Sequence, residues 1–274
     1  MTRLLLVALF YSTVVFAGNN EAIPTCYNEN IPAKNGATNV ELFVIVDQTT
    51  YFDGNLKQSI ADNIRPFLKP GNAFSVTEFS AFIQGHYTEV LVSGRMDSIL
   101  DNDARDDTGK PSLSKFDNCM GNQAKLARQV VGNALKISFG SDVKIHKSDI
   151  LASLKDISSK VRQSTAKNKV VLIASDMLEN SSISSFYTKQ AVRQINVDYE
   201  LKLVADSNLF GDFGGASIYV IGAGLIADDS KSTNGIYRSQ QVMRSLSTFW
   251  KTWFQQSNAE LVEFGQPALL NPVR

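Results

Sequence analysis

Apolar residues recur along this chain in two patterns, one typical of buried strands and the other of amphipathic helices. Six runs rich in β-branched and aliphatic side chains predict strands at residues 40–46, 73–79, 86–92, 169–175, 216–222 and 259–264. The first and fourth runs are almost continuously apolar, as in parallel strands that are covered on both faces. The second and third have Gln84-Gly85 between them, which predicts an antiparallel hairpin.

Apolar positions at helical spacing predict helices at residues 55–68, 123–139, 148–164 and 239–256. Ser148 is the expected N-cap of the third helix. Residues 183–196 also have a helical but mixed pattern, and residues 200–205 are expected to form an edge strand. Residues 18–38 are polar and rich in Asn, Pro and Gly, which predicts an extended arm. Residues 93–122 are polar and acidic, which predicts a long surface insertion.

The alternation of strands and helices predicts a doubly wound α/β fold. We expect three layers, α/β/α, around a mostly parallel sheet that has an antiparallel edge strand. The expected single domain spans residues 39–270 and contains the insertion. Hydrophobic residues make up 43% of the 274 residues, which is enough for a sizeable core. Lys and Arg number 27, as do Asp and Glu, so no basic surface favours a nucleic-acid partner.

Residues 1–17 have the pattern of a secretory signal peptide. Arg3 precedes a short apolar run, and Val15 and Ala17 place small residues before an expected cleavage at Gly18. A membrane anchor is the alternative, but the run is shorter than the roughly 20 residues of a spanning helix. We therefore expect an exported protein, periplasmic or extracellular, with no transmembrane span in the mature chain.

The cysteine content agrees with export. Cys26 and Cys119 are the only two cysteines, and an even pair in an exported protein predicts one disulfide. This bond would tie the N-terminal arm to the middle of the chain. The alternatives are two free thiols or a metal pair, and the latter is disfavoured because no His or further Cys lies at ligand spacing.

Two aspartates follow buried strands: Asp47 comes after residues 40–46, and Asp176 after residues 169–175. Ligands of open α/β sheets bind outside the carboxyl ends of the strands, at the switch point of the strand order. We therefore expect both carboxylates at one edge, where neighbouring hydroxyls would help them to hold Mg²⁺, or Ca²⁺ or Mn²⁺. The alternative is that both are cap and turn residues, stabilised by backbone N–H groups.

With these elements, residues 38–268 resemble the von Willebrand factor A (vWA) family. In that family the first strand ends in Asp-x-Ser-x-Ser, a Thr comes from a later loop, and an Asp ends the fourth strand. Together they form a metal-ion-dependent adhesion site, whose cation accepts a carboxylate from a partner protein. Asp47 and Thr49 match the first Asp and the first Ser, and Asp176 matches the Asp of the fourth strand.

The match to the metal site is degenerate. Tyr51 replaces the second Ser, and Met177 replaces the Gly that commonly follows the last Asp. Ser148 or Asp149 lies where the Thr loop of the family enters its helix. The resemblance implies metal ligands among Asp47, Thr49, Ser148, Asp149 and Asp176. It also implies a partner-binding surface at Gln48, Thr50, Tyr51 and Met177.

The resemblance implies a non-catalytic, exported module that binds another protein, through an acidic side chain of that partner, in an envelope assembly or a surface adhesion system. His86 and His146 are the only histidines, and no Gly-x-Ser-x-Gly elbow occurs, so no catalytic constellation is predicted. Two alternatives stay open. Carboxylates at strand ends also occur in metal-assisted phosphoester hydrolases, and a degenerate site could belong to a metal-free scaffold.

Overall fold

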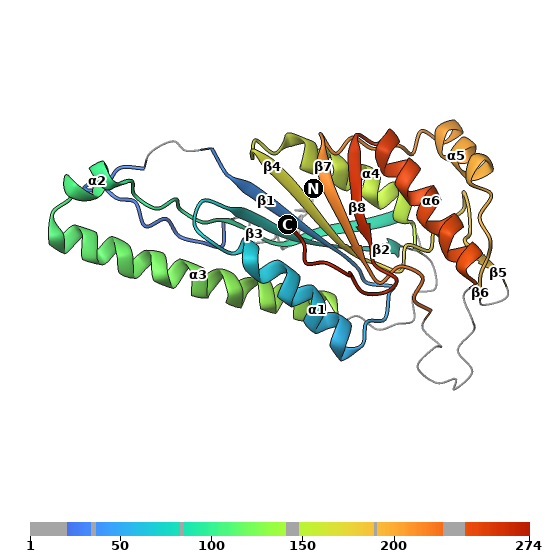
Figure 1. Ribbon diagram of the computed structural model, residues 1–274, viewed down its shortest axis with the longest axis horizontal. Coiled ribbons are helices and arrows are strands. Elements are labelled where there is room, and N and C mark those ends of the chain that lie inside the picture. The colour runs from blue at the N-terminus through green and yellow to red at the C-terminus, as the bar shows by residue number, and fades with distance from the viewer. Residues whose placement is uncertain (1–20, 34–36, 83–84, 141–147, 189–190, 227–238) are drawn as a thin grey trace, which may run out of the picture.

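A six-stranded sheet forms the middle layer of the structure, with helices on both of its faces (Figure 1). The computed structural model describes residues 21–33, 37–82, 85–140, 148–188, 191–226 and 239–274. The strands are β1 (Val40–Asp47), β2 (Ala73–Phe82), β3 (Gly85–Arg95), β4 (Asn168–Ala174), β5 (Tyr187–Thr188), β6 (Ala191–Val192), β7 (Ala216–Ile221) and β8 (Ala259–Phe264). The helices are α1 (Gly54–Ile64), a 3₁₀ turn (Arg65–Phe67), α2 (Asn102–Asp106), α3 (Lys110–Ser138), α4 (Ile150–Gln163), α5 (Val197–Asp206) and α6 (Gln240–Gln256).

The strand order is β3-β2-β1-β4-β7-β8, and β5 pairs with β6 in a separate hairpin. β1 is parallel to β2 and β4, β7 is parallel to β4 and β8, and β2 and β3 are antiparallel. The predicted fold class is therefore confirmed. The chain passes from β1 to β2 on one side and later enters β4 on the other side of β1, so the switch point lies between β1 and β4.

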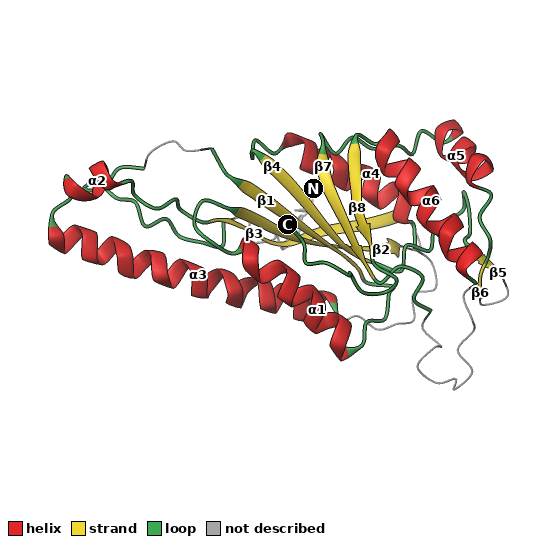
Figure 2. Cartoon of the chain, viewed as in Figure 1, coloured by secondary structure: helices red, strands yellow, loops and turns green. Residues whose placement is uncertain are grey.

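Successive side chains of β1 point into two different cores. Leu42 and Val44 belong to the core that contains residues of α1 and α3, whereas Phe43 and Ile45 belong to the core that contains residues of α4, α5 and α6. Figure 2 shows the corresponding helices on the two sides of the sheet. Because both faces of β1 are covered, the strand is almost continuously apolar in sequence.

The helix predicted at residues 123–139 begins earlier, within the predicted insertion at residues 93–122. These residues form the end of β3, the short helix α2 and the first part of α3, which has 29 residues. Before Gln123, Phe116 is the only buried residue of α3. This part of the helix extends beyond the sheet (Figure 1) and therefore lacks the apolar stripe by which a packed helix is identified in sequence.

The predicted disulfide between Cys26 and Cys119 is present and joins the N-terminal arm to α3. The buried side chains of Ile31, Leu100 and Phe116 surround it and form a small apolar cluster apart from the two main cores. The arm is thus fixed to the part of α3 that projects past the sheet.

Two predictions of secondary structure are wrong. Residues 200–205 lie in α5 rather than in an edge strand, because the buried Glu200 and Val204 are one helical turn apart. Residues 183–196 contain the β5–β6 hairpin instead of a helix. The expected signal peptide at 1–17 lies outside the described residues, and none of the helices within the described part of the chain is long and apolar enough to cross a membrane.

Candidate functional site

Asp47 and Asp176 lie at the same edge of the sheet. Asp47 is the last residue of β1, and Asp176 lies two residues after the end of β4, its parallel neighbour. The pairing of Val46 with Ala174 places the carboxyl ends of both strands side by side. The structure thus brings the two aspartates to the switch point, where the sequence predicted them.

Asp47 is a buried carboxylate surrounded by hydrogen-bond donors. Its Oδ1 accepts bonds from the backbone N–H (2.9 Å) and the hydroxyl (2.6 Å) of Thr49. Its Oδ2 accepts bonds from the hydroxyls of Ser175 (2.8 Å) and Ser148 (3.3 Å). Burial raises the pKa of Asp47, and the hydrogen bonds from Thr49 and Ser175 oppose that rise. Ser175, which was not predicted as a site residue, is therefore part of the site.

Asp176 is held from several directions. Its Oδ1 accepts the backbone N–H of Leu178 (2.8 Å), and its Oδ2 accepts the hydroxyl of Tyr187 (3.1 Å). Its own N–H donates to the hydroxyl oxygen of Thr50 (3.0 Å). Burial raises the pKa of the Tyr187 phenol, and the charges of Asp176 and Asp47 raise it further, so this hydroxyl remains a donor at neutral pH.

The start of α4 contributes one hydroxyl to the site. The N-cap of α4 is Asp149, whose carboxylate accepts the N–H of Ala152 (3.2 Å), so the prediction that Ser148 is the N-cap is wrong. The hydroxyl of Ser148 instead points to Asp47. The two neighbours thus have different roles, since Asp149 stabilises the helix and Ser148 reaches the site.

A third buried acid connects α4 to the loop after β4. Glu179 Oε2 accepts the N–H of Leu151 (3.0 Å), whereas its Oε1 is buried without a hydrogen-bond partner. Burial raises the pKa of Glu179 to about 8. The N–H of Asn180 donates to the carbonyl of Ser148 (2.9 Å), so backbone and side-chain bonds both hold the Ser148 segment against the Asp176 loop.

The four residues predicted to bind a partner have very different environments. Tyr51 is the most exposed, with 46% of its surface accessible, whereas Gln48 and Thr50 are half-buried. Met177 is fully buried in the core, and its carbonyl accepts the indole N–H of Trp250 (2.8 Å). The structure therefore leaves Met177 no exposed surface for a partner.

The donor set of the site is compatible with a hard cation. Asp47 and Asp176 supply carboxylate oxygens, and the hydroxyl oxygens of Thr49 and Ser148 keep lone pairs after donating their protons to Asp47. Mg²⁺ prefers such oxygen ligands and usually keeps several waters. Across the described ranges, however, no three His, Cys, Asp or Glu side chains form a group that could hold a metal ion, so hydroxyls and water would complete the shell.

A scan of protein-family models finds no match to this chain, and a search of curated proteins finds none either.

Proposed function

We propose that this protein is an exported, vWA-like module that binds another protein at the carboxyl edge of its sheet. The observation that carries the proposal is the convergence of Asp47 and Asp176, with three hydroxyls, at the switch point between β1 and β4. The proposed ligands of a divalent cation are Asp47, Thr49, Ser148 and Asp176. The remaining exposed rim includes Tyr51.

The residues of the site are pre-organised. Thr49 fixes one oxygen of Asp47, and Ser148 and Ser175 fix the other, so the carboxylate needs no reorientation when a ligand arrives. Pre-organisation reduces the ordering cost of binding. A bound Mg²⁺ would supply an open coordination position for an acidic side chain of the partner.

Export is supported by the disulfide between Cys26 and Cys119, because such bonds persist mainly in oxidising compartments. We propose a periplasmic or extracellular location, in an envelope assembly or a surface adhesion system. Recovery of the mature protein only from the cytosol would contradict this location.

The test combines calorimetry with capture of the partner. The oxidised protein should bind Mg²⁺, Mn²⁺ or Ca²⁺, and it should retain a partner from the native envelope or secretome only without chelator. Asp47→Asn keeps the shape of the side chain but removes its charge, and it should abolish both effects. Asp62→Asn is the matched control, because Asp62 lies exposed on α1.

Each alternative function predicts a different result. A metal-free scaffold would give neither heat nor a thermal shift with any of the three cations. A metal-assisted hydrolase would cleave members of a phosphodiester panel and lose that activity in Asp47→Asn. Either result would replace the proposed function.

A further inference from the structure

The β5–β6 hairpin delivers a tyrosine to the candidate site. The hydroxyl of Tyr187 donates to Asp176 Oδ2 (3.1 Å), while the N–H of Leu178 donates to Oδ1 (2.8 Å). One donor on each oxygen fixes the plane of the carboxylate. The orientation of Asp176 therefore depends on where the hairpin lies.

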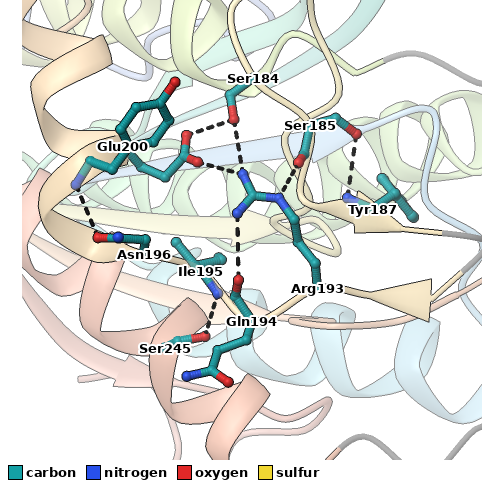
Figure 3. A network of polar contacts seen from close by, with 10 residues as sticks. Ser184, Ser185, Tyr187, Arg193, Gln194, Ile195, Asn196, Glu200 and Ser245 are labelled. Carbon is teal, nitrogen blue, oxygen red and sulfur yellow. Dashed lines mark hydrogen bonds and ion pairs between the residues drawn. The ribbon is translucent and has the colours of Figure 1, made fainter.

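The hairpin itself is too short to fix its own position. Each strand has two residues, and an isolated two-stranded hairpin is marginally stable in water at best. Its position must therefore come from contacts with the rest of the protein. Figure 3 shows the polar network that supplies them.

An ion pair between Arg193 and Glu200 lies at the centre of this network (Figure 3). Glu200 belongs to α5 and is buried, and its other oxygen accepts the hydroxyl of Ser184 (2.6 Å). The Nε of Arg193 donates to the carbonyl of Ser185 (2.6 Å). The guanidinium thus ties both sides of the hairpin to α5.

Backbone and ring contacts hold the residue next to Tyr187. The N–H of Phe186 donates to the carbonyl of Glu179 (2.8 Å), and the carbonyl of Phe186 accepts the N–H of Arg193 (2.9 Å). The Arg193 guanidinium lies 5.6 Å from the centre of the Phe186 ring, which packs edge-on against Phe249. The backbone at Phe186, which directly precedes Tyr187, is therefore held by both its N–H and its carbonyl.

We propose that Tyr187 is a positioning residue for Asp176, and that the Arg193–Glu200 ion pair sets its place by locking the β5–β6 hairpin onto α5. The consequence for cation affinity rests on the proposed function, but the effect on Asp176 does not. Hydrogen-bond donors behind a ligating carboxylate orient it, and their loss typically lowers metal affinity by about 10- to 100-fold. The hairpin thereby becomes a structural determinant of the site.

The test compares two variants with two matched controls. Tyr187→Phe removes only the donating hydroxyl, and Glu200→Gln removes the charge that holds Arg193. Tyr199→Phe alters an exposed tyrosine of α5, and Asp206→Asn alters the acid of an exposed ion pair with Lys202 on the same helix.

The first readout needs no cation. In ¹³C and ¹⁵N spectra, Tyr187→Phe and Glu200→Gln should shift the carboxyl carbon of Asp176 and the amide of Leu178, whereas both controls leave them unchanged. Unchanged signals in Tyr187→Phe would overturn the inference, whatever the protein binds. Because Tyr187→Phe preserves the packing of the ring, it decides the question even where Glu200→Gln fails to fold.

The second readout is the affinity for Mn²⁺ by calorimetry. We expect Tyr187→Phe to weaken it about tenfold, Glu200→Gln to weaken it too, and the controls to match the wild type. Equal binding by Tyr187→Phe would mean that the hydroxyl does not contribute to cation affinity, and tighter binding would mean that it obstructs the cation. Either result would overturn the inference. If the wild type binds no cation, the metal-bridged function fails, and the spectra alone decide whether Tyr187 positions Asp176.

Discussion

The two ends of the sheet are held together by different kinds of interaction. At the amino end, the Cys26–Cys119 disulfide and a small apolar cluster join the N-terminal arm to α3. At the carboxyl end, hydroxyls and backbone N–H groups surround the buried carboxylates of Asp47 and Asp176. One end is fixed by a covalent bond, and the other by polar contacts to charged groups.

The two kinds of interaction differ in how strongly they depend on charge. A disulfide acts mainly by restricting the unfolded chain and does not depend on protonation at neutral pH. Hydrogen bonds to a buried carboxylate depend on its charge, which protons and cations change. The amino end is therefore secured by a bond that does not depend on charge, while the contacts at the carboxyl end do depend on it.

The largest expected effect on stability is at the amino end. Replacing both cysteines, Cys26→Ser with Cys119→Ser, should lower the free energy of unfolding by about 4 kcal/mol, because the bond links residues 93 apart. Urea denaturation measures this loss. Reduced wild-type protein is the control and should lose a similar amount.

The same double variant tests whether the two ends of the sheet are independent of each other. Under conditions where it is fully folded, its affinity for Mg²⁺ or Mn²⁺ should equal that of the wild type. A loss of affinity in the folded variant would mean that the arm and the carboxyl edge are coupled.

The second effect is a pH dependence at the carboxyl end. Burial raises the pKa of Glu179 from 4.5 to about 8, so the folded state keeps a proton that the unfolded state releases between these values. Stability is therefore highest below pH 4.5 as far as this group is concerned, and it falls as the pH rises to about 8. In the wild type, the free energy of unfolding should fall by an amount on the order of 4 kcal/mol between pH 4.5 and about 8, and Glu179→Gln should not show this fall.

Urea denaturation at a series of pH values tests the direction of this pH dependence. The stability of Glu179→Gln relative to wild type should increase with pH, and Glu260→Gln, at an exposed position, is the matched control. A constant difference for Glu179→Gln would show that Glu179 has its ordinary pKa in the folded protein. The Cys26→Ser, Cys119→Ser variant should retain the wild-type pH dependence, which separates the two ends again.

The sequence predicted the central strands well because both faces of each are covered. The runs at 40–46 and 169–175 match β1 and β4 to within one residue at each end, and Asp47 and Asp176 lie at the predicted edge because they follow these apolar runs. The start of α3 was missed because it projects past the sheet and buries only Phe116 before Gln123. Local pattern is informative only where an element packs on a core.

The surroundings of the two aspartates could not be predicted in the same way. The hydroxyl of Ser175 reaches Asp47 across the sheet, and that contact depends on strand order. Tyr187 reaches Asp176 from a hairpin whose position depends on Arg193 and α5. Ser175 could have been proposed as a site residue because it directly precedes Asp176 in the sequence. No local feature of the sequence points to Tyr187.

The smallest expected effects concern two buried serines, Ser175 in the site and Ser158 on α4. Ser175 donates to Asp47 and accepts the N–H of Met177 (2.9 Å), whereas Ser158 accepts the N–H of Asp212 (2.9 Å). Ser175→Ala and Ser158→Ala should each lower the free energy of unfolding by about 1–2 kcal/mol, because each leaves a backbone N–H without its partner. Only Ser175→Ala should also weaken Mg²⁺ binding in calorimetry, since only it removes a donor that orients Asp47. Equal binding by the two variants would mean that Thr49 and Ser148 suffice to orient Asp47. The hydrogen bonds that matter for cation binding would then be those of these two residues alone.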